Sequence, residues 1–399
     1  MTTNELDMWA DDFQGFHARF NHLFVRSETR EQSKKYIRGL MATIERKNSW
    51  NIAETVGDKT PDPTQRLLYK AKWNSDDARD ILQDFIIENF SDKEAIGVVD
   101  ETGFIKKGDK SVGVQRQYSG TAGKTENCQI GTFLSYTSGD VHVFLDRRLY
   151  LPESWCKDQQ RRIQAKIPDD MEFKSKPEQA IEMLEYVFMK DIPMKWVTGD
   201  EVYGDSTHLR DTVIKHGRFY VFAVRSDELV WITRPEVDSP KKGNRGRPRQ
   251  KARLAEGATP PRSVADVVSG INDKWERMAV IEGTKGPCTY DWFCIRIVEN
   301  RNGLPGPDSW LLIRRSISSE EISYYLSNAP IDTELKTLAR VASTRYTVEQ
   351  CIEEAKGEAG LDEYEVRQWH SWHRHITLSM MAHTWLVSIR YQSSKKGVH

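Results

Sequence analysis

The sequence lacks the features that mark several classes of protein. It has no run of about 18 apolar residues, the length that a membrane-spanning helix needs. Its five cysteines are scattered without a CxxC pair, which argues against a zinc ribbon and for a reducing compartment. Its first residues include acids where a signal peptide would carry lysines. We therefore expect a cytoplasmic protein without a membrane partner.

The chain also lacks an excess of charge of either sign. Its 58 Lys and Arg residues nearly balance 59 Asp and Glu residues, for a net charge of -1. This sum disfavours a nucleic-acid partner at first sight, but the distribution is uneven. Residues 239–253 contain seven basic residues and no acid.

The 399 residues are enough for two or three domains, and the hydrophobic periodicity divides them. Residues 13–89 repeat apolar positions every three to four residues, which predicts helices. From residue 95, short apolar runs alternate with helical segments, which indicates an α/β core. Residues 226–335 are mostly strand-like, and a helical period follows them. We predict a helical N-terminal DNA-binding domain (1–92), a core (93–225), a β-rich insertion with a basic loop (226–335) and C-terminal core helices (336–399).

A DNA-binding role is one of two possibilities for the N-terminal helices at this point. Their middle is basic and their ends are acidic, as expected either for a domain that contacts DNA or for a helical cap with solvated charges.

Two acids directly follow apolar runs that predict strands. Asp100 closes GVVD and Asp200 closes VTGD. Carboxylates at the carboxyl ends of neighbouring strands converge in an α/β sheet, where metal sites are commonly built. An Asp in this position can also be a simple turn or cap residue.

A third group stands on a predicted helix near residue 350. Arg345, Glu349, Glu353 and Lys356 are spaced to share one helix face. Such a pattern can be an exposed face with ion pairs. It also suits a metal-bound phosphate, because a carboxylate can hold Mg²⁺ while Arg and Lys bind the remaining oxygens.

The order Asp100, Asp200, then Arg345-x₃-Glu349-x₆-Lys356 resembles the DDE transposases of bacterial insertion sequences. Within them it is similar to the group with the signature Tyr-x₂-Arg-x₃-Glu-x₆-Lys. The signature tyrosine is absent, because position 342 is Ala. The resemblance extends over residues 95–390 through RQYSGTAGKTENCQIG, RRLYLPESW, GDEVYG and GLDEYEVRQWHSWHRHITL.

The resemblance implies an RNase H-like catalytic fold with a β-rich insertion before the final acid. It implies an enzyme that cleaves transposon ends and joins the 3′-hydroxyl to target DNA, with Mg²⁺ as cofactor and Mn²⁺ as a substitute. The partners would be double-stranded DNA, at terminal inverted repeats and target, and a second copy of the chain on DNA near the bacterial nucleoid.

Asp100, Asp200 and Glu349 are the expected catalytic and metal-binding residues. Their nearest rivals are Glu101, Glu201 and Glu353. Two other functions stay open: a transposase-derived protein that binds DNA without cutting it, and an RNase H-like nuclease that hydrolyses without joining.

Several basic residues are expected to contact DNA. Arg345 and Lys356 would bind the phosphate at the cleaved end, and Arg245 to Pro248 resemble either an AT-hook core or a generic phosphate-binding loop. The remaining candidates are Arg116, Arg147, Arg148, Lys241, Lys242, Arg245, Arg247 and Arg249. For Arg116, Arg147 and Arg148, packing within the strand hairpin stays open as the alternative.

Tryptophans of the insertion are candidates to receive a flipped base. Trp231, Trp292 and Trp310 lie in this segment, although core packing is the commoner role of a tryptophan.

Overall fold

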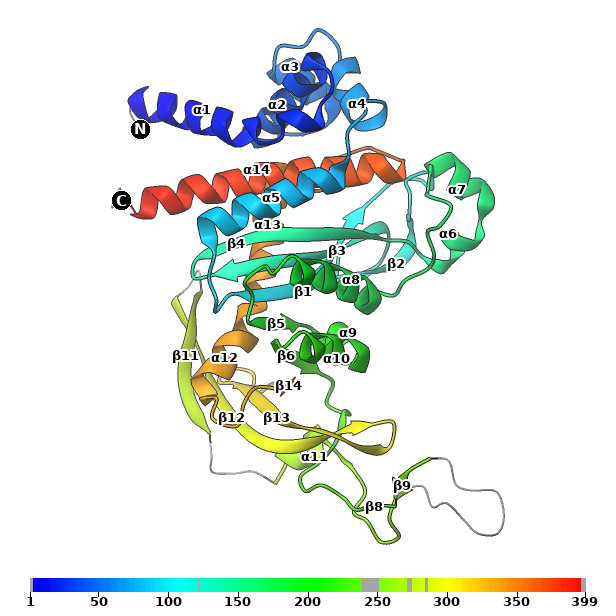
Figure 1. The fold of residues 1–399 in the computed structure, drawn as a ribbon, viewed down its shortest axis with the longest axis vertical. Helices are drawn as coiled ribbons and strands as arrows, with labels where there is room; N and C mark the ends of the chain where they lie inside the picture. The colour runs from blue at the N-terminus through cyan, green and yellow to red at the C-terminus, as the bar shows by residue number, and fades with distance from the viewer. Residues whose placement is uncertain (1–2, 121, 239–250, 271–274, 284–285, 396–399) are drawn as a thin grey trace. The chain divides into compact units, whose positions relative to one another are not determined.

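The computed structural model describes residues 3–120, 122–238, 251–270, 275–283 and 286–395. The chain forms two compact units (Figure 1). The first contains Met1–Pro193 and Tyr346–His399, and the second contains Met194–Arg345.

The first unit begins with a group of helices, as the apolar spacing predicted. Asn48 and Asn74 start two of them, because each side-chain oxygen accepts backbone N–H groups that have no partner in the first helical turn. The elements are α1 (Thr3–Ala18), the 3-10 turn η1 (Asn21–Leu23), α2 (Ser27–Met41), α3 (Ser49–Thr55), α4 (Asp62–Tyr69) and α5 (Ser75–Phe90).

An antiparallel sheet follows these helices. The long strand β3 pairs with β2 and with β1, and β4 pairs with β3 as a hairpin partner. The turn at 139–140 uses Gly139 with a positive φ of 56°. The strands are β1 (Ile96–Ile105), β2 (Gln115–Ser119), β3 (Lys124–Ser138) and β4 (Val141–Tyr150).

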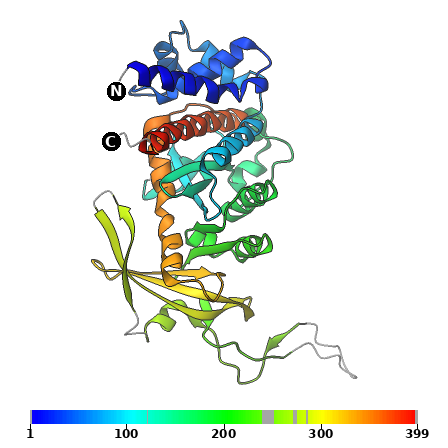
Figure 2. The ribbon, with the colours of Figure 1, turned by 60° about the vertical axis from the view of Figure 1, so that its left-hand side comes forward.

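Helices cover both faces of this sheet. α8 lies on one face, where Gln179 accepts a hydrogen bond from Thr132 Oγ1 at 2.8 Å and donates to the carbonyl of Leu149. α13 and α14 pack on the other face (Figure 2). The remaining elements of the unit are α6 (Glu153–Lys157), α7 (Gln159–Ala165), α8 (Lys176–Met189), α13 (Tyr346–Ala359) and α14 (Trp369–Lys395).

The second unit is built on a parallel pair of strands. β5 (Trp196–Gly199) pairs in parallel with β6 (Phe219–Val224), and α9 (Glu201–Gly204) and α10 (Thr207–Lys215) connect them. On its other side β6 pairs with β14 (Ile322–Ser327), which pairs with β13 (Leu304–Ser316), which in turn pairs with β12 (Gly286–Arg301). All three of these pairings are antiparallel. α12 (Leu335–Thr344) packs on β5 and β6.

The rest of the second unit is strand-rich, as predicted for residues 226–335. Within the described part of that range, α11 (Val264–Val268) is the only helix that lies wholly inside it. The strands are β7 (Leu229–Trp231), β8 (Val237–Asp238), β9 (Arg253–Leu254), β10 (Arg262–Ser263) and β11 (Glu276–Gly283). The predicted α/β class is confirmed.

Neutral histidines form part of the core of the first unit. His375 of α14 is fully buried, and its Nε2 donates to the carbonyl of Gly360 at 3.0 Å. Its Nδ1 therefore accepts from the hydroxyl of Tyr36 in α2, at 2.8 Å. Burial lowers the pKa of His375 to about 3, and burial together with Lys34 and Arg30 lowers that of His17 to about 4.

Because these histidines stay neutral in the folded protein, we predict that the protein loses stability in mild acid. The unfolded chain takes up a proton near pH 6.5, whereas the folded chain does not until about pH 4 at His17 and about pH 3 at His375. Each histidine should therefore lower the free energy of unfolding by up to about 1.4 kcal/mol per pH unit below 6.5. Urea unfolding between pH 7.5 and pH 5 measures this slope.

A non-titrating variant provides the control. His17 Nε2 lies 2.8 Å from the hydroxyl of Ser33, which itself donates to a carbonyl, so a glutamine amide can replace the imidazole as donor. His17→Gln should make the slope shallower by about one proton. Equal slopes in the variant and the wild type would contradict this account of His17.

Candidate active site

β1 positions Asp100 in the first unit. Asp100 stands in register with Phe133 of β3, and its Oδ1 accepts the backbone N–H of Glu101 at 2.8 Å. Successive side chains of a strand point to opposite faces, so Asp100 shares a face with Thr102 and Phe104. Phe104 packs against Trp372 of α14, with 6.4 Å between ring centroids. Asp100 therefore lies on the face of the sheet that α13 and α14 cover.

Glu101 points to the opposite face. Its carboxylate forms an ion pair with Lys176 Nζ of α8 at 2.5 Å. Its cross-strand neighbour Thr132 also contacts α8, through Gln179. The two adjacent acids of β1 therefore face different helices.

α13 is tied to β1 through Lys356. Lys356 Nζ donates to Thr102 Oγ1 at 2.9 Å, on the same face of the strand as Asp100. Burial lowers the pKa of this half-buried lysine, against the opposing effect of the Asp362 and Glu353 carboxylates. The contact orients one flank of α13 toward the strand that carries Asp100.

Glu349 stands on this flank of α13. At 100° per residue, Glu349 is about 20° from Lys356 around the helix axis, and Glu353 is about 60° from it. The buried residues Val348, Ile352 and Ala355 form the adjacent face that packs on the core. Both glutamates are exposed.

The second unit positions Asp200 between β5 and α9. Its Oδ1 accepts the backbone N–H of Val202 at 2.9 Å, which makes Asp200 the N-cap of the short helix. Gly204 ends this helix where it meets β6, and a Cβ there would lie 1.8 Å from the carbonyl oxygen of Ala223. The glycine therefore allows α9, with Asp200 at its start, to lie directly against the neighbouring strand.

Arg345 lies at the junction of two helices. The single helix expected to carry both Arg345 and Glu349 is in fact divided: α12 ends at Thr344, Arg345 has helical dihedral angles, and α13 begins at Tyr346. In the second unit, Arg345 and Glu201 both act electrostatically on the buried hydroxyl of Tyr325, whose pKa is raised by its burial.

Arg147 and Arg148 belong to a buried ion network. Arg147 is fully buried; its guanidinium bonds Asp76 at 2.8 Å, Asp146 at 3.3 Å and Thr377 Oγ1 at 3.0 Å. Arg148 bonds Asp146 at 2.9 Å. The structure thus gives Arg147 a structural role, and burial of this kind is incompatible with the predicted contact to DNA.

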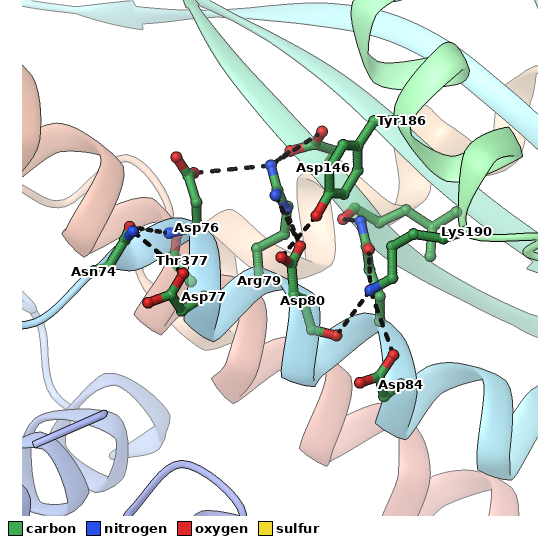
Figure 3. Close-up of polar contacts among 12 residues, drawn as sticks. Asn74, Asp76, Asp77, Arg79, Asp80, Asp84, Asp146, Tyr186, Lys190 and Thr377 are labelled. Carbon is green, nitrogen blue, oxygen red and sulfur yellow. Dashed lines mark hydrogen bonds and ion pairs between the residues drawn. The ribbon is translucent and has the colours of Figure 1, made fainter. Parts of the chain in front are cut away.

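The same network continues into α5. Figure 3 shows Arg79 directed toward Asp76, Asp80 and Asp146, with N–O distances of 3.8, 2.7 and 3.2 Å. Burial alone would raise the pKa of Asp146, but the surrounding arginines lower it below its usual value. The network connects α5 to β4 through ion pairs.

The other predicted DNA contacts differ in their placement. Arg116 is exposed on β2, beside the exposed Tyr118. Lys241, Lys242, Arg245, Arg247 and Arg249 lie outside the described residues.

The three predicted acids are distributed over both units. Asp100 and Glu349 belong to the first unit, and Asp200 to the second. Within the described ranges, no three His, Cys, Asp or Glu side chains are grouped in a way that could hold a metal ion. The donor chemistry of the three carboxylates nevertheless fits Mg²⁺, which prefers oxygen ligands.

Comparison with known proteins identifies the family. A model of the DDE superfamily endonucleases matches residues 14–287, which is more than half of the chain. The chain belongs to this family of DDE endonucleases. It is also 23% identical over 337 residues to a Microchaete diplosiphon protein described as a probable transposase for insertion sequence element IS701, covering 84% of this chain and 77% of that protein.

The matches confirm the resemblance that the motifs indicated. They also confirm the predicted RNase H-like fold class of this DDE endonuclease. The family match includes Asp100 and Asp200 and ends before Glu349. The choice of the third acid therefore depends on the signature spacing and on the geometry of α13.

Sequence reasoning missed two side chains of this DDE endonuclease. Thr102 on one face of β1 binds Lys356, and Lys176 of α8 binds Glu101 on the other face. The alternation of the strand could have indicated the direction of Thr102, but no local pattern indicates the pairing of Lys176. None of the described helices is both long and apolar enough to span a membrane.

Gly204 provides a test of how Asp200 is positioned. Gly204→Ala should lower the unfolding free energy by about 1–3 kcal/mol, because the added methyl group overlaps the Ala223 carbonyl and one of the two backbones must move. Thermal unfolding followed by circular dichroism measures the loss. Gly270→Ala is the matched control, since an added Cβ there meets no atom within 4 Å; equal losses in both variants would contradict the steric explanation.

Proposed function

We propose that this DDE endonuclease is an insertion-sequence transposase. It binds the inverted repeats at transposon ends, cleaves the DNA there and joins the freed 3′-hydroxyl to target DNA. Membership of the endonuclease family and the similarity to a probable transposase support this function. Two ends must be held at once, so the acting form is a homodimer on DNA, in the cytoplasm at the nucleoid.

The hydrogen bond between Lys356 and Thr102 carries the assignment of residues. It supports Asp100 over Glu101, because Glu101 faces α8 and is already paired with Lys176. For the third acid, Glu349 lies about 20° from Lys356 in angle around the helix axis and Glu353 about 60°, which supports Glu349 together with the spacing of the signature.

The catalytic residues are Asp100, Asp200 and Glu349. They would hold Mg²⁺, or Mn²⁺ in its place, through carboxylate oxygens. Such ions, when bound, stabilise the charge on the attacking and leaving oxygens of an in-line displacement. Lys356 and Arg345 orient the phosphate at the cleaved end, Lys356 from a position where Thr102 already fixes its ammonium group.

Neutral isosteres of the acids test this assignment. Asp100→Asn, Asp200→Asn and Glu349→Gln should each lower the rate of end cleavage by about 10³-fold or more, roughly 4 kcal/mol of transition-state stabilisation. Duplex binding should persist, because no negative charge is needed to hold phosphates. Nicking of DNA that carries the element's ends, with Mg²⁺ and then Mn²⁺, measures the effect.

The rival acids are the matched controls. Glu101→Gln and Glu353→Gln should keep most of the cleavage activity. An active Glu349→Gln together with an inactive Glu353→Gln would move the third carboxylate by one helical turn. Full activity in all three acid variants would overturn the proposed function.

A further inference from the structure

Three adjoining hollows form one groove on the first unit. Their volumes are about 540, 290 and 520 Å³. The first and second share Asn48, Tyr364 and Arg367, and the second and third share Gln65 and Tyr69. The groove therefore runs between the α3–α4 region, the end of β1 and the segment that joins α13 to α14.

The groove is basic although the chain as a whole is neutral. Its lining contains eight Lys and Arg residues and four Asp and Glu residues. Six of the cations are exposed and make no ion pair within the described ranges. They are Arg46, Arg66, Lys70, Lys107, Lys166 and Arg367.

Two of the acids in the lining already interact with other groups of the protein. A carboxylate oxygen of Glu363 accepts the backbone N–H of Lys47 at 2.6 Å. Asp362 acts electrostatically on Lys106 and Lys356. The exposed cations thus dominate the field that a ligand in the groove would meet.

The walls of the groove are fixed to the elements that carry Asp100 and Glu349. Lys47 Nζ donates to the carbonyls of Gly357 and Glu358, at 3.0 and 2.6 Å, and so caps the C-terminal end of α13. Lys106, directly after β1, donates to the carbonyl of Tyr364 at 2.8 Å and lies 3.5 Å from that ring's centroid.

An exposed tryptophan stands in the middle hollow. Trp50 is 61% exposed, whereas the other 11 of the chain's 12 tryptophans are buried or half-buried. By contrast, Trp231 and Trp292 of the insertion are buried. An exposed indole beside unpaired cations is the combination that binds nucleobases together with phosphates.

The groove begins at the end of β1 that follows Asp100. Lys106 stands six positions after Asp100, which corresponds to about 20 Å of extended chain. Duplex DNA advances 3.4 Å per phosphate along each strand, so this distance spans about six base pairs.

We propose that this groove binds the DNA that flanks the cleaved phosphate, about six base pairs away, through its phosphates. The six exposed cations contact the backbone, and Trp50 stacks on a nucleobase where the flank is single-stranded. This proposal depends on the proposed function for the identity of the DNA, but its test needs no cleavage.

The salt dependence of DNA affinity tests the cations. The slope of log K against log salt, for a 40-base-pair duplex of arbitrary sequence, reports how many phosphates are neutralised. Arg66→Ala/Lys70→Ala should lower its magnitude by about 1.8. Arg26→Ala/Lys93→Ala is the control, because it removes the same charge from exposed positions outside the groove lining.

An unchanged slope in the groove variant, or equal reductions in both variants, would overturn the groove as a DNA site. Either result would leave the acid variants above as a separate test of the enzyme. If the wild type bound no duplex at all, both the groove and the proposed function would fail.

A second measurement tests Trp50. Trp50→Ala should weaken binding of a duplex with a six-nucleotide single-stranded tail by about tenfold, and Trp50→Phe should restore most of it. Binding of a blunt duplex should change little. Equal losses for tailed and blunt probes, or no loss in either, would exclude base stacking at Trp50.

Discussion

The attachment of α13 to β1 is the constraint on which the candidate site depends. Lys356 loses part of its hydration at this contact, as the lowered pKa of its ammonium group reflects, and Thr102 replaces one of the lost water contacts. The apolar residues Val348, Ile352 and Ala355 fix the same helix from the side of the core. Because both attachments act on one helix, the direction of Glu349 is set by packing rather than by the flexibility of a loop.

The sequence was informative where a local pattern decides the structure. The apolar run before Asp100 forms a strand, and alternation along that strand sets which acid faces α13. The break at Arg345 was not predictable, because helical dihedral angles persist through it and the spacing of the signature is unchanged. The basic residues of 241–249 lie outside the described residues.

Arg147 illustrates why charged motifs are poor guides to a binding surface. Its partner Asp76 is 71 positions away in sequence, and Arg79 of the same network pairs with Asp146 across 67 positions. No local pattern reveals such pairing, since burial of an ion depends on tertiary partners that compensate its desolvation. Arg147 of the RRLY motif therefore connects α5 to β4 through its ion pairs.

A protein with a net charge near zero can still present a basic surface. Several acids of the first unit already have basic partners: Asp146 is fully buried among arginines, and Glu354 bonds Arg390 at 3.0 Å. Cations such as Arg66 and Lys166 stay exposed at the groove. Salt screens charges over about 8 Å at physiological ionic strength, so a phosphate responds to the cations near it and not to the sum over the chain. Net charge near zero is thus compatible with local attraction for DNA, because a phosphate in the groove lies near more cations than acids.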